Sequence, residues 1–244
     1  MAAIEEPDEP AAEGRGGQRV ARADGRPPAA VVLDLDGVLI EGEEVWDDVR
    51  RALVQERGGR WGPQAQAAMM GMSSPEWSRY MAEELGLPMA PAAISDEVVA
   101  RVVARYAEEL PLVDGAVEVV RALADRWPLG LASSANRPVI DLVLDRAGLS
   151  GCFRATVSSE EVARGKPAPD VYLAAAARLG VAPAACAAVE DSANGLRAAA
   201  AAGMRVVAVP NRRFPPPAEL VEAADLVVAE LRELTPEALE RLGG

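Results

Sequence analysis

Short apolar runs alternate with longer amphipathic stretches along most of the chain. Runs bounded by turn-forming or acidic residues predict buried strands at 29–33, 129–132, 155–157, 187–189 and 206–209, with a weaker candidate at 226–228. Helical periodicity between them predicts helices at 116–126, 138–147, 170–179 and 193–202. Strands and helices that alternate at this spacing predict an α/β fold built on a doubly wound parallel sheet.

One segment breaks the alternation, because residues 41–110 show helical periodicity (45–57, 76–85 and 96–110) and no strand pattern. We therefore expect an α-helical insert at 42–110 and an α/β core formed by 29–41 and 111–244. Residues 1–28 are rich in Ala, Gly, Glu, Asp, Arg and Pro, which predicts a disordered tail. Ligands of open α/β sheets bind at the carboxyl ends of the strands, so the insert is expected to cover that edge.

Composition excludes several classes of function. The chain has 244 residues, 50% of them hydrophobic, which is enough for a sizeable core. Its net charge of −13 argues against nucleic-acid and anionic-membrane partners. It contains no histidine and two cysteines, which excludes a His-based triad, His metal ligands and a disulfide framework. No stretch fits a transmembrane span or a signal peptide, so a cytoplasmic location is expected.

Acidic residues stand where two of the predicted strands end. Asp34 and Asp36 follow the first strand, and Glu190 and Asp191 follow the run at 187–189. Without this context, Asp34 and Asp36 are typical of a solvated turn, and Glu190 and Asp191 are more often charges at a helix N-terminus. Four carboxylates converging at one sheet edge, however, would need a cation, and oxygen ligands without His or Cys favour Mg²⁺.

Anion-binding groups are expected at the same edge. Ser133, Ser134 and Asn136 precede a predicted helix, where hydroxyls and free N–H groups bind phosphate oxygens or merely cap the helix. Lys166 follows the third predicted strand and is the one lysine among 25 basic residues. Because the chain otherwise uses arginine, this position is interpreted as one that needs an ammonium group.

The order of these motifs resembles that of the haloacid dehalogenase superfamily over about residues 30–230. The resemblance is carried by Leu33-Asp34-Leu35-Asp36-Gly37-Val38-Leu39, by Gly165-Lys166-Pro167-Ala168-Pro169-Asp170 and by Val189-Glu190-Asp191-Ser192-Ala193-Asn194-Gly195. These stretches are similar to the β-phosphoglucomutase-like phosphatase branch, whose α-helical cap lies where the insert is expected.

The resemblance implies a Mg²⁺-dependent phosphatase that acts on a small phosphorylated metabolite through an aspartyl-phosphate intermediate. Asp34 would be the nucleophile and Asp36 the general acid and base, while Ser133 and Lys166 would hold the phosphoryl oxygens. The metal ligands would come from Asp34, Asp36, Glu190 and Asp191. Substrate contacts are expected from Ser133, Ser134, Asn136, Lys166, Glu43 and Trp46, and the expected oligomeric state is a monomer or weak homodimer.

Departures from the family pattern separate the alternatives. Metal-free dehalogenases lack the second aspartate and the acidic pair, and phosphonatases use a cap lysine that this chain lacks. β-Phosphoglucomutases carry a histidine where Trp46 stands and an arginine near Ser73-Ser74. This chain has neither residue at these places, which argues against a phosphomutase. A phosphomutase and a non-catalytic protein that binds phosphorylated ligands stay open as alternatives.

Overall fold

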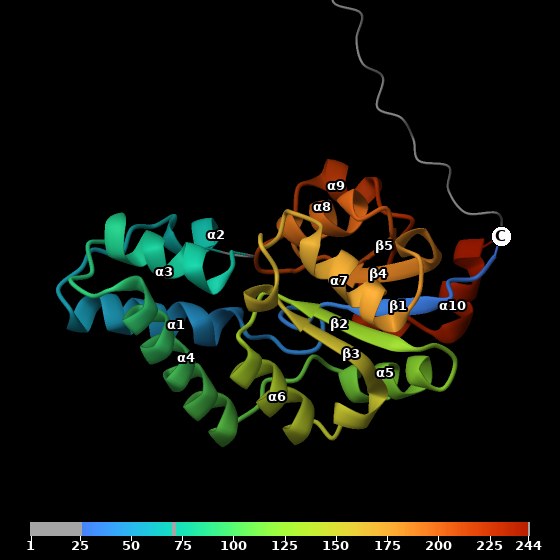
Figure 1. Cartoon of the computed structure of the whole chain (residues 1–244), viewed down its shortest axis with the longest axis horizontal. Coiled ribbons are helices and arrows are strands. Elements are labelled where there is room, and N and C mark those ends of the chain that lie inside the picture. The colour runs from blue at the N-terminus through green and yellow to red at the C-terminus, as the bar shows by residue number, and fades with distance from the viewer. Residues whose placement is uncertain (1–25, 70–71, 244) are drawn as a thin grey trace, which may run out of the picture.

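A computed structural model describes residues 26–69 and 72–243, and the predicted tail falls almost wholly outside this range. Its centre is a six-stranded sheet (Figure 1). The strands are β1 (Ala30–Leu33), β2 (Leu129–Ser133), β3 (Phe153–Ser158), β4 (Cys186–Glu190), β5 (Arg205–Ala208) and β6 (Leu226–Val227). All six predicted strands are therefore found, including the weak candidate near the C-terminus.

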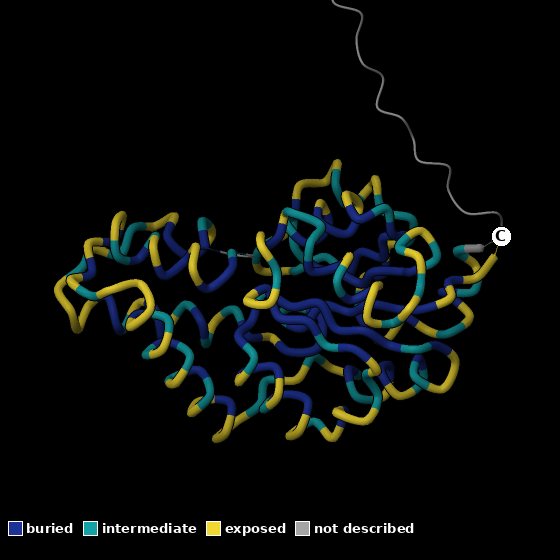
Figure 2. Tube along the Cα trace, viewed as in Figure 1, coloured by how far each residue is buried: buried dark blue, intermediate teal, exposed yellow. Residues whose placement is uncertain are grey.

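The strand order is β3-β2-β1-β4-β5-β6, and every pairing is parallel. Strands β1, β2, β4 and β5 are buried along their whole length, which explains their continuous apolar sequences. Figure 2 shows these strands as the buried centre of the molecule. The predicted α/β class is confirmed.

Helices cover both faces of the sheet (Figure 1). One face packs against α5 (Ala116–Ala124), α6 (Arg137–Arg146) and α10 (Pro236–Glu240), and the other against α7 (Asp170–Leu179), α8 (Ala193–Ala201) and α9 (Ala218–Glu222). Successive strand residues point to opposite faces, so Val31 and Leu33 join the first apolar cluster while Ala30 and Val32 join the second. The alanines of α7 and α8 lie in the second cluster, where small side chains allow close packing against the sheet.

Four further helices lie between β1 and α5 and stand beside the sheet rather than over one of its faces (Figure 1). They are α1 (Glu43–Glu56), α2 (Ala65–Met69), α3 (Ser74–Glu83) and α4 (Pro91–Glu108). Apolar side chains from all four are buried in the same cluster as the core residues under α5 and α6. We refer to residues 42–110 as the helical insert.

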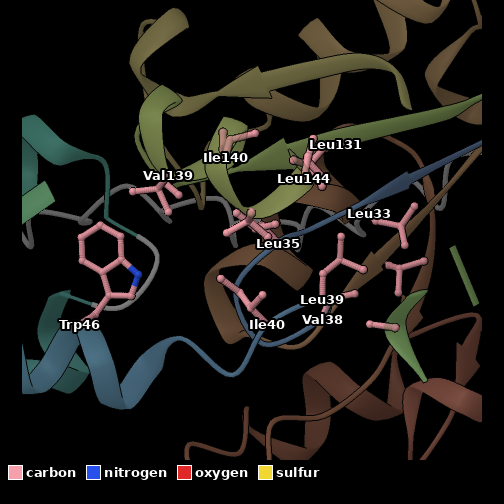
Figure 3. Packing of buried hydrophobic residues seen from close by; sticks show 14 of the residues in the cluster. Leu33, Leu35, Val38, Leu39, Ile40, Trp46, Leu131, Val139, Ile140 and Leu144 are labelled. Atoms are coloured by element: carbon pink, nitrogen blue, oxygen red, sulfur yellow. The ribbon is translucent and has the colours of Figure 1, made fainter. Parts of the chain in front are cut away.

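The chain passes from β1 into the insert through a tight turn at the carboxyl end of the strand. Figure 3 shows Leu35, Val38, Leu39 and Ile40, the apolar residues of this turn, between Leu33 and the indole of Trp46. Because these apolar side chains are buried, the side chains of Asp34 and Asp36 on either side of Leu35 are held in fixed directions. Within the described part of the chain, no helix is both long and apolar enough to cross a membrane.

Candidate active site

The turn after β1 places Asp34 and Asp36 at the carboxyl edge of the sheet. The Asp34 side chain is buried, and Asp36 is half-buried. Gly37 has a positive φ of 83°, and a Cβ atom built on it would lie 1.8 Å from Asp191 Oδ2. Only glycine therefore suits this position, because the backbone is left-handed and a neighbouring carboxylate occupies the side-chain space.

Lys166 is buried between two carboxylates. Its Nζ lies 2.8 Å from Asp34 Oδ1, an ion-pair distance, and donates a hydrogen bond to Glu190 Oε1 at 2.6 Å. Burial lowers the pKa of the ammonium, but Asp34 and Glu190 outweigh this effect and raise the Lys166 pKa above its ordinary value. The one lysine of the chain is thus charged, and it lies at the carboxyl edge of the sheet, where the sequence predicted a positive group beside the carboxylates.

Glu190 is fully buried, and donors surround both of its oxygens. Oε1 also accepts from the Tyr172 hydroxyl at 2.7 Å, while Oε2 accepts from the backbone N–H groups of Asp191 and Ser192 at 3.0 and 3.2 Å. The Ser192 hydroxyl donates to Oε2 as well. Glu190 therefore positions Lys166 and the start of α8, and its role as a metal ligand stays a prediction from the sequence.

The carboxyl groups of Asp34, Asp36 and Asp191 have pKa values above the ordinary value for aspartate. Burial raises the pKa of both Asp34 and Asp36 to about 7, with added repulsion from Glu190 at Asp34 and from Glu43 at Asp36. Burial, Glu190 and Asp34 raise the pKa of Asp191 well above its ordinary value. Asp191 Oδ2 accepts from Asn211 Nδ2 at 2.8 Å, whereas Oδ1 is buried with no hydrogen-bond partner.

This arrangement fits a divalent cation. Asp34, Glu190 and Asp191 offer carboxylate oxygens that lie within 4.8 Å of one another. A hard cation with oxygen ligands would relieve the repulsion among these groups and satisfy the unpartnered oxygen of Asp191. The chemistry of the donor set therefore agrees with the predicted Mg²⁺.

Two predicted substrate contacts from the insert reach the same place. Trp46 Nε1 donates to Asp36 Oδ1 at 3.2 Å, so the indole restrains the carboxyl expected to act as general acid. Glu43 Oε2 accepts from Gln66 Nε2 at 3.1 Å. Both side chains come from the first turn of α1, which begins directly after the turn at Asp36.

The sequence analysis missed a second set of residues in the insert. Arg50 is buried, and its Cζ lies 4.8 Å from the ring centroids of both Trp46 and Trp77. Its Nη1 donates to Gln66 Oε1 at 3.4 Å, and its Nε has no hydrogen-bond partner. An arginine in an amphipathic helix is usually solvated, so the sequence carries no signal that separates Arg50 from Arg51.

The predicted phosphate-binding serines lie at the carboxyl end of β2, where Ser133 is the last residue of the strand and Ser134 follows it. Ser133 is fully buried, and its Oγ accepts from the Ala135 N–H at 2.9 Å. Asn136 is engaged elsewhere, because its Oδ1 accepts from Ser74 Oγ at 2.8 Å and its Nδ2 donates to Glu160 at 2.6 Å. Asn136 thus connects α3 of the insert with the N-terminus of α6, a role the sequence analysis did not foresee.

A cavity of about 50 Å³ lies between the insert and the sheet edge. Asp34, Asp36, Glu43, Trp46, Ser134, Lys166 and Asp191 line it, together with Arg50, Met69, Met72, Trp77, Ala135 and Ser192. Among the predicted site residues, Ser133, Asn136 and Glu190 are absent from this lining. The cavity brings a carboxylate pair, a buried ammonium and a candidate metal site within reach of one phosphoryl group.

Comparison with known proteins gives concordant matches. The family described as haloacid dehalogenase-like hydrolase matches residues 28–203. Hexitol phosphatase B from Escherichia coli (strain K12) is 34% identical over 212 residues, which cover 84% of this chain and 94% of that protein. The crystal structure of CbbY from Rhodobacter sphaeroides in complex with phosphate superposes with a TM-score of 0.76 at 29% identity, covering 87% of this chain and 99% of the other.

A third match is to a longer protein. The bifunctional riboflavin kinase/FMN phosphatase from Arabidopsis thaliana is 32% identical over 208 residues, which cover 84% of this chain. This chain spans about half of that protein, 54% of its length.

Proposed function

This chain belongs to the haloacid dehalogenase-like hydrolase family, and we propose that it removes phosphate from a small phosphorylated metabolite with the help of Mg²⁺. The family, the enzyme class and the phosphatase assignment predicted from the sequence are thereby confirmed. The observation that best supports the full proposal is Lys166 held between Asp34 and Glu190, beside an Asp191 oxygen that has no hydrogen-bond partner.

In the proposed first step, a carboxylate oxygen of Asp34 attacks the phosphorus atom of the substrate. The bond between phosphorus and the leaving-group oxygen breaks, and Asp36 gives its proton to that oxygen. Because the pKa of Asp36 is raised to about 7, this carboxyl group can hold a proton near neutral pH and release it. The products are a free alcohol and an aspartyl-phosphate at Asp34.

In the second step, Asp36 takes a proton from a water molecule, whose oxygen attacks the phosphorus of the aspartyl-phosphate. The bond between phosphorus and Asp34 breaks, which regenerates the carboxylate and releases inorganic phosphate. Trp46 holds Asp36 through its indole N–H, so the same carboxyl group stays in place for both proton transfers.

Charge on the phosphoryl oxygens must be offset during both steps. Lys166 is charged and lies at Asp34, so it can hold a phosphoryl oxygen there, and Ser133 and Ser134 supply polar groups at the carboxyl end of β2. Asp34 and Asp191 would hold the metal ion, with Asp36 and Glu190 beside them. When bound, Mg²⁺ would neutralise the carboxylates and the transferring phosphoryl group.

The test is phosphate release from a panel of sugar phosphates, phosphoglycolate and an aryl phosphate, in Mg²⁺ and in chelator. We expect metal-dependent release in the wild type and its loss in Asp34→Asn. Asp141→Asn is the matched control, because that carboxylate is exposed on α6 and only pairs with Arg137. No release from any compound by folded, Mg²⁺-loaded protein would contradict the proposal and direct the search to isomerised products or to ligand binding alone.

A cytoplasmic location and a monomeric or weakly dimeric state remain predictions from the sequence.

A further inference from the structure

Arg50 brings a positive charge into the cavity, where Glu43, Asp36 and Asp47 attract it without forming a direct ion pair. Its side chain is 6% exposed and lines the same cavity as Asp34, Asp36 and Lys166. Within residues 26–69 and 72–243, no carboxylate oxygen lies at ion-pair distance from it. Arg51, the next residue on α1, shows the usual surface arrangement, since it pairs with Asp47 at 2.7 Å.

The surroundings of Arg50 hold the guanidinium in place. Its Cζ is 4.8 Å from the centroids of both Trp46 and Trp77, and the two centroids are 6.2 Å apart. The group therefore lies in the angle between two indole rings, which attract the cation but offer no hydrogen-bond acceptor to its Nε–H group. A planar guanidinium held in this way is well suited to a ligand that approaches its edge.

The side-chain amide of Gln66 lies between Arg50 and the carboxylate of Glu43. Its amide oxygen accepts from Arg50 Nη1 at 3.4 Å, and its amide nitrogen donates to Glu43 Oε2 at 3.1 Å. Arg50 and Glu43 are thus bridged through an amide and do not form a direct ion pair. The Arg50 Nε stays buried and unpartnered, a costly arrangement unless a ligand supplies the acceptor.

We propose that Arg50 receives an anionic oxygen group on the leaving-group part of the substrate, so that this enzyme selects phosphate esters that carry a carboxylate or a second phosphate. Lys166 and the candidate metal site hold the phosphoryl group at the sheet edge, and Arg50 lies across the same cavity on α1. An edge-on carboxylate or phosphate forms paired hydrogen bonds with a guanidinium, which a hydroxyl cannot match in strength. The inference rests on the proposed phosphatase function and adds its selectivity.

Two matched substrate pairs test this inference. 6-Phosphogluconate and sorbitol 6-phosphate share a six-carbon chain and differ in a terminal carboxylate, whereas fructose 1,6-bisphosphate and fructose 1-phosphate differ in a second phosphate. The measured quantity is the ratio of kcat/KM for the anionic and the neutral member. We expect the wild type to favour the anionic member of at least one pair, and the pair identifies which anion is accepted.

Arg50→Met removes the charge and keeps an apolar side chain between the indoles. We expect it to lower the selectivity ratio by about 10- to 100-fold, mainly through KM of the anionic member, as loss of a hydrogen bond to a charged group predicts. Arg50→Lys should retain part of the preference, and it supplies a second test if the methionine variant folds poorly. Arg51→Met is the matched control and should leave the ratio unchanged.

Calorimetric binding in chelator separates this inference from the proposed reaction. If the wild type binds the anionic member more tightly and Arg50→Met loses this difference, the inference is supported even when no compound is hydrolysed. The absence of hydrolysis would then contradict only the phosphatase proposal. The inference is overturned if the wild type favours the neutral member of both pairs. Arg50 would then bind hydroxyl groups of the substrate rather than an anionic group. The inference is also overturned if Arg50→Met keeps the wild-type ratio.

Discussion

Lys166 shows how a buried charge is tolerated in this protein. Its side chain is 2% exposed, and the side chains of Asp34 and Glu190 that it contacts are 8% and 0% exposed. Removing three charges from water is costly, and the direct contacts of 2.8 and 2.6 Å offset this cost only while all three groups are present. The arrangement therefore serves the site more than it stabilises the fold.

Lys166→Met should lower the free energy of unfolding by about 3–5 kcal/mol, because it leaves Glu190 and Asp34 buried without their cation. Urea denaturation at neutral pH measures the change. Arg164→Met is the control, since Arg164 pairs with Asp170 at 3.0 Å on the surface with 70% of its side chain exposed. Loss of that pair should cost less than about 1 kcal/mol. Equal losses in the two variants would contradict this account of Lys166.

Residue types at strand ends were enough to predict Asp34, Asp36, Lys166 and Asp191 as members of one site, because the edge of a parallel sheet brings them together. Arg50, Tyr172 and Asn211 could not be found in that way. Each reaches the site from a helix or a loop, and its orientation depends on packing between elements. No local pattern distinguishes a tyrosine that donates to Glu190 from one that only fills the core.

Strands β1, β2, β4 and β5 were predictable because each is a short run, mostly apolar, that is buried on both faces of the sheet. Helices α2, α9 and α10 escaped prediction, since five residues are too few to show a 3.6-residue period. Helix α4 starts at Pro91, before the periodic apolar positions begin, because proline is well accommodated in the first turn. Domain boundaries at 41/42 and 110/111 stay a prediction.

Helix α8 begins against a carboxylate, and this closeness depends on Gly195. A Cβ atom added there would lie 1.9 Å from the Glu190 carboxylate carbon. Gly195→Ala should therefore displace Glu190, lower stability by about 1–3 kcal/mol and reduce phosphate release.

Thermal unfolding and phosphate release measure the effects of Gly195→Ala. Gly151→Ala is the control, because nothing lies within 4 Å of a Cβ atom built at that position. A Gly195→Ala variant with wild-type stability and activity would show that Glu190 is free to move.

Across the whole molecule, the buried carboxyl groups link stability to pH. The pKa values of Asp34 and Asp36 are about 7 in the folded chain and about 3.8 in the unfolded chain, so the folded state binds more protons between these values. The resulting stability is fully present below about pH 4 and is lost as the pH rises through about 7. The melting temperature of metal-free protein should therefore fall between pH 5 and pH 8.

Mg²⁺ should reverse this loss, raising the melting temperature more at pH 8 than at pH 5, because it binds the deprotonated carboxylates. Asp191→Asn removes one of the repelling charges and should flatten the pH dependence in chelator while weakening the response to Mg²⁺. A metal-free protein that is more stable at pH 8 than at pH 5 would contradict the raised pKa values. Scanning calorimetry provides all three comparisons.

The insert and the core enclose little space around the reacting groups. A volume of about 50 Å³ is well below the roughly 300–1,000 Å³ of ordinary ligand sites, so the larger part of a sugar phosphate requires the insert to move. A second cavity of about 550 Å³, lined by Glu43, Glu44, Pro111 and Arg213, borders both connections between insert and core. The ion pair between Arg213 and Glu44 crosses this region and would have to adjust.

Because the chain has a single lysine, the site can be observed by NMR spectroscopy without attaching a probe or substituting a residue. Labelling lysine with 15N at Nζ would place one side-chain ammonium resonance in the spectrum, and that resonance would come from Lys166 alone. Its chemical shift should respond when inorganic phosphate or Mg²⁺ is added, and it should stay unchanged through the titration of surface groups. The occupancy of the phosphoryl-binding position could then be followed directly, in intact protein and during turnover.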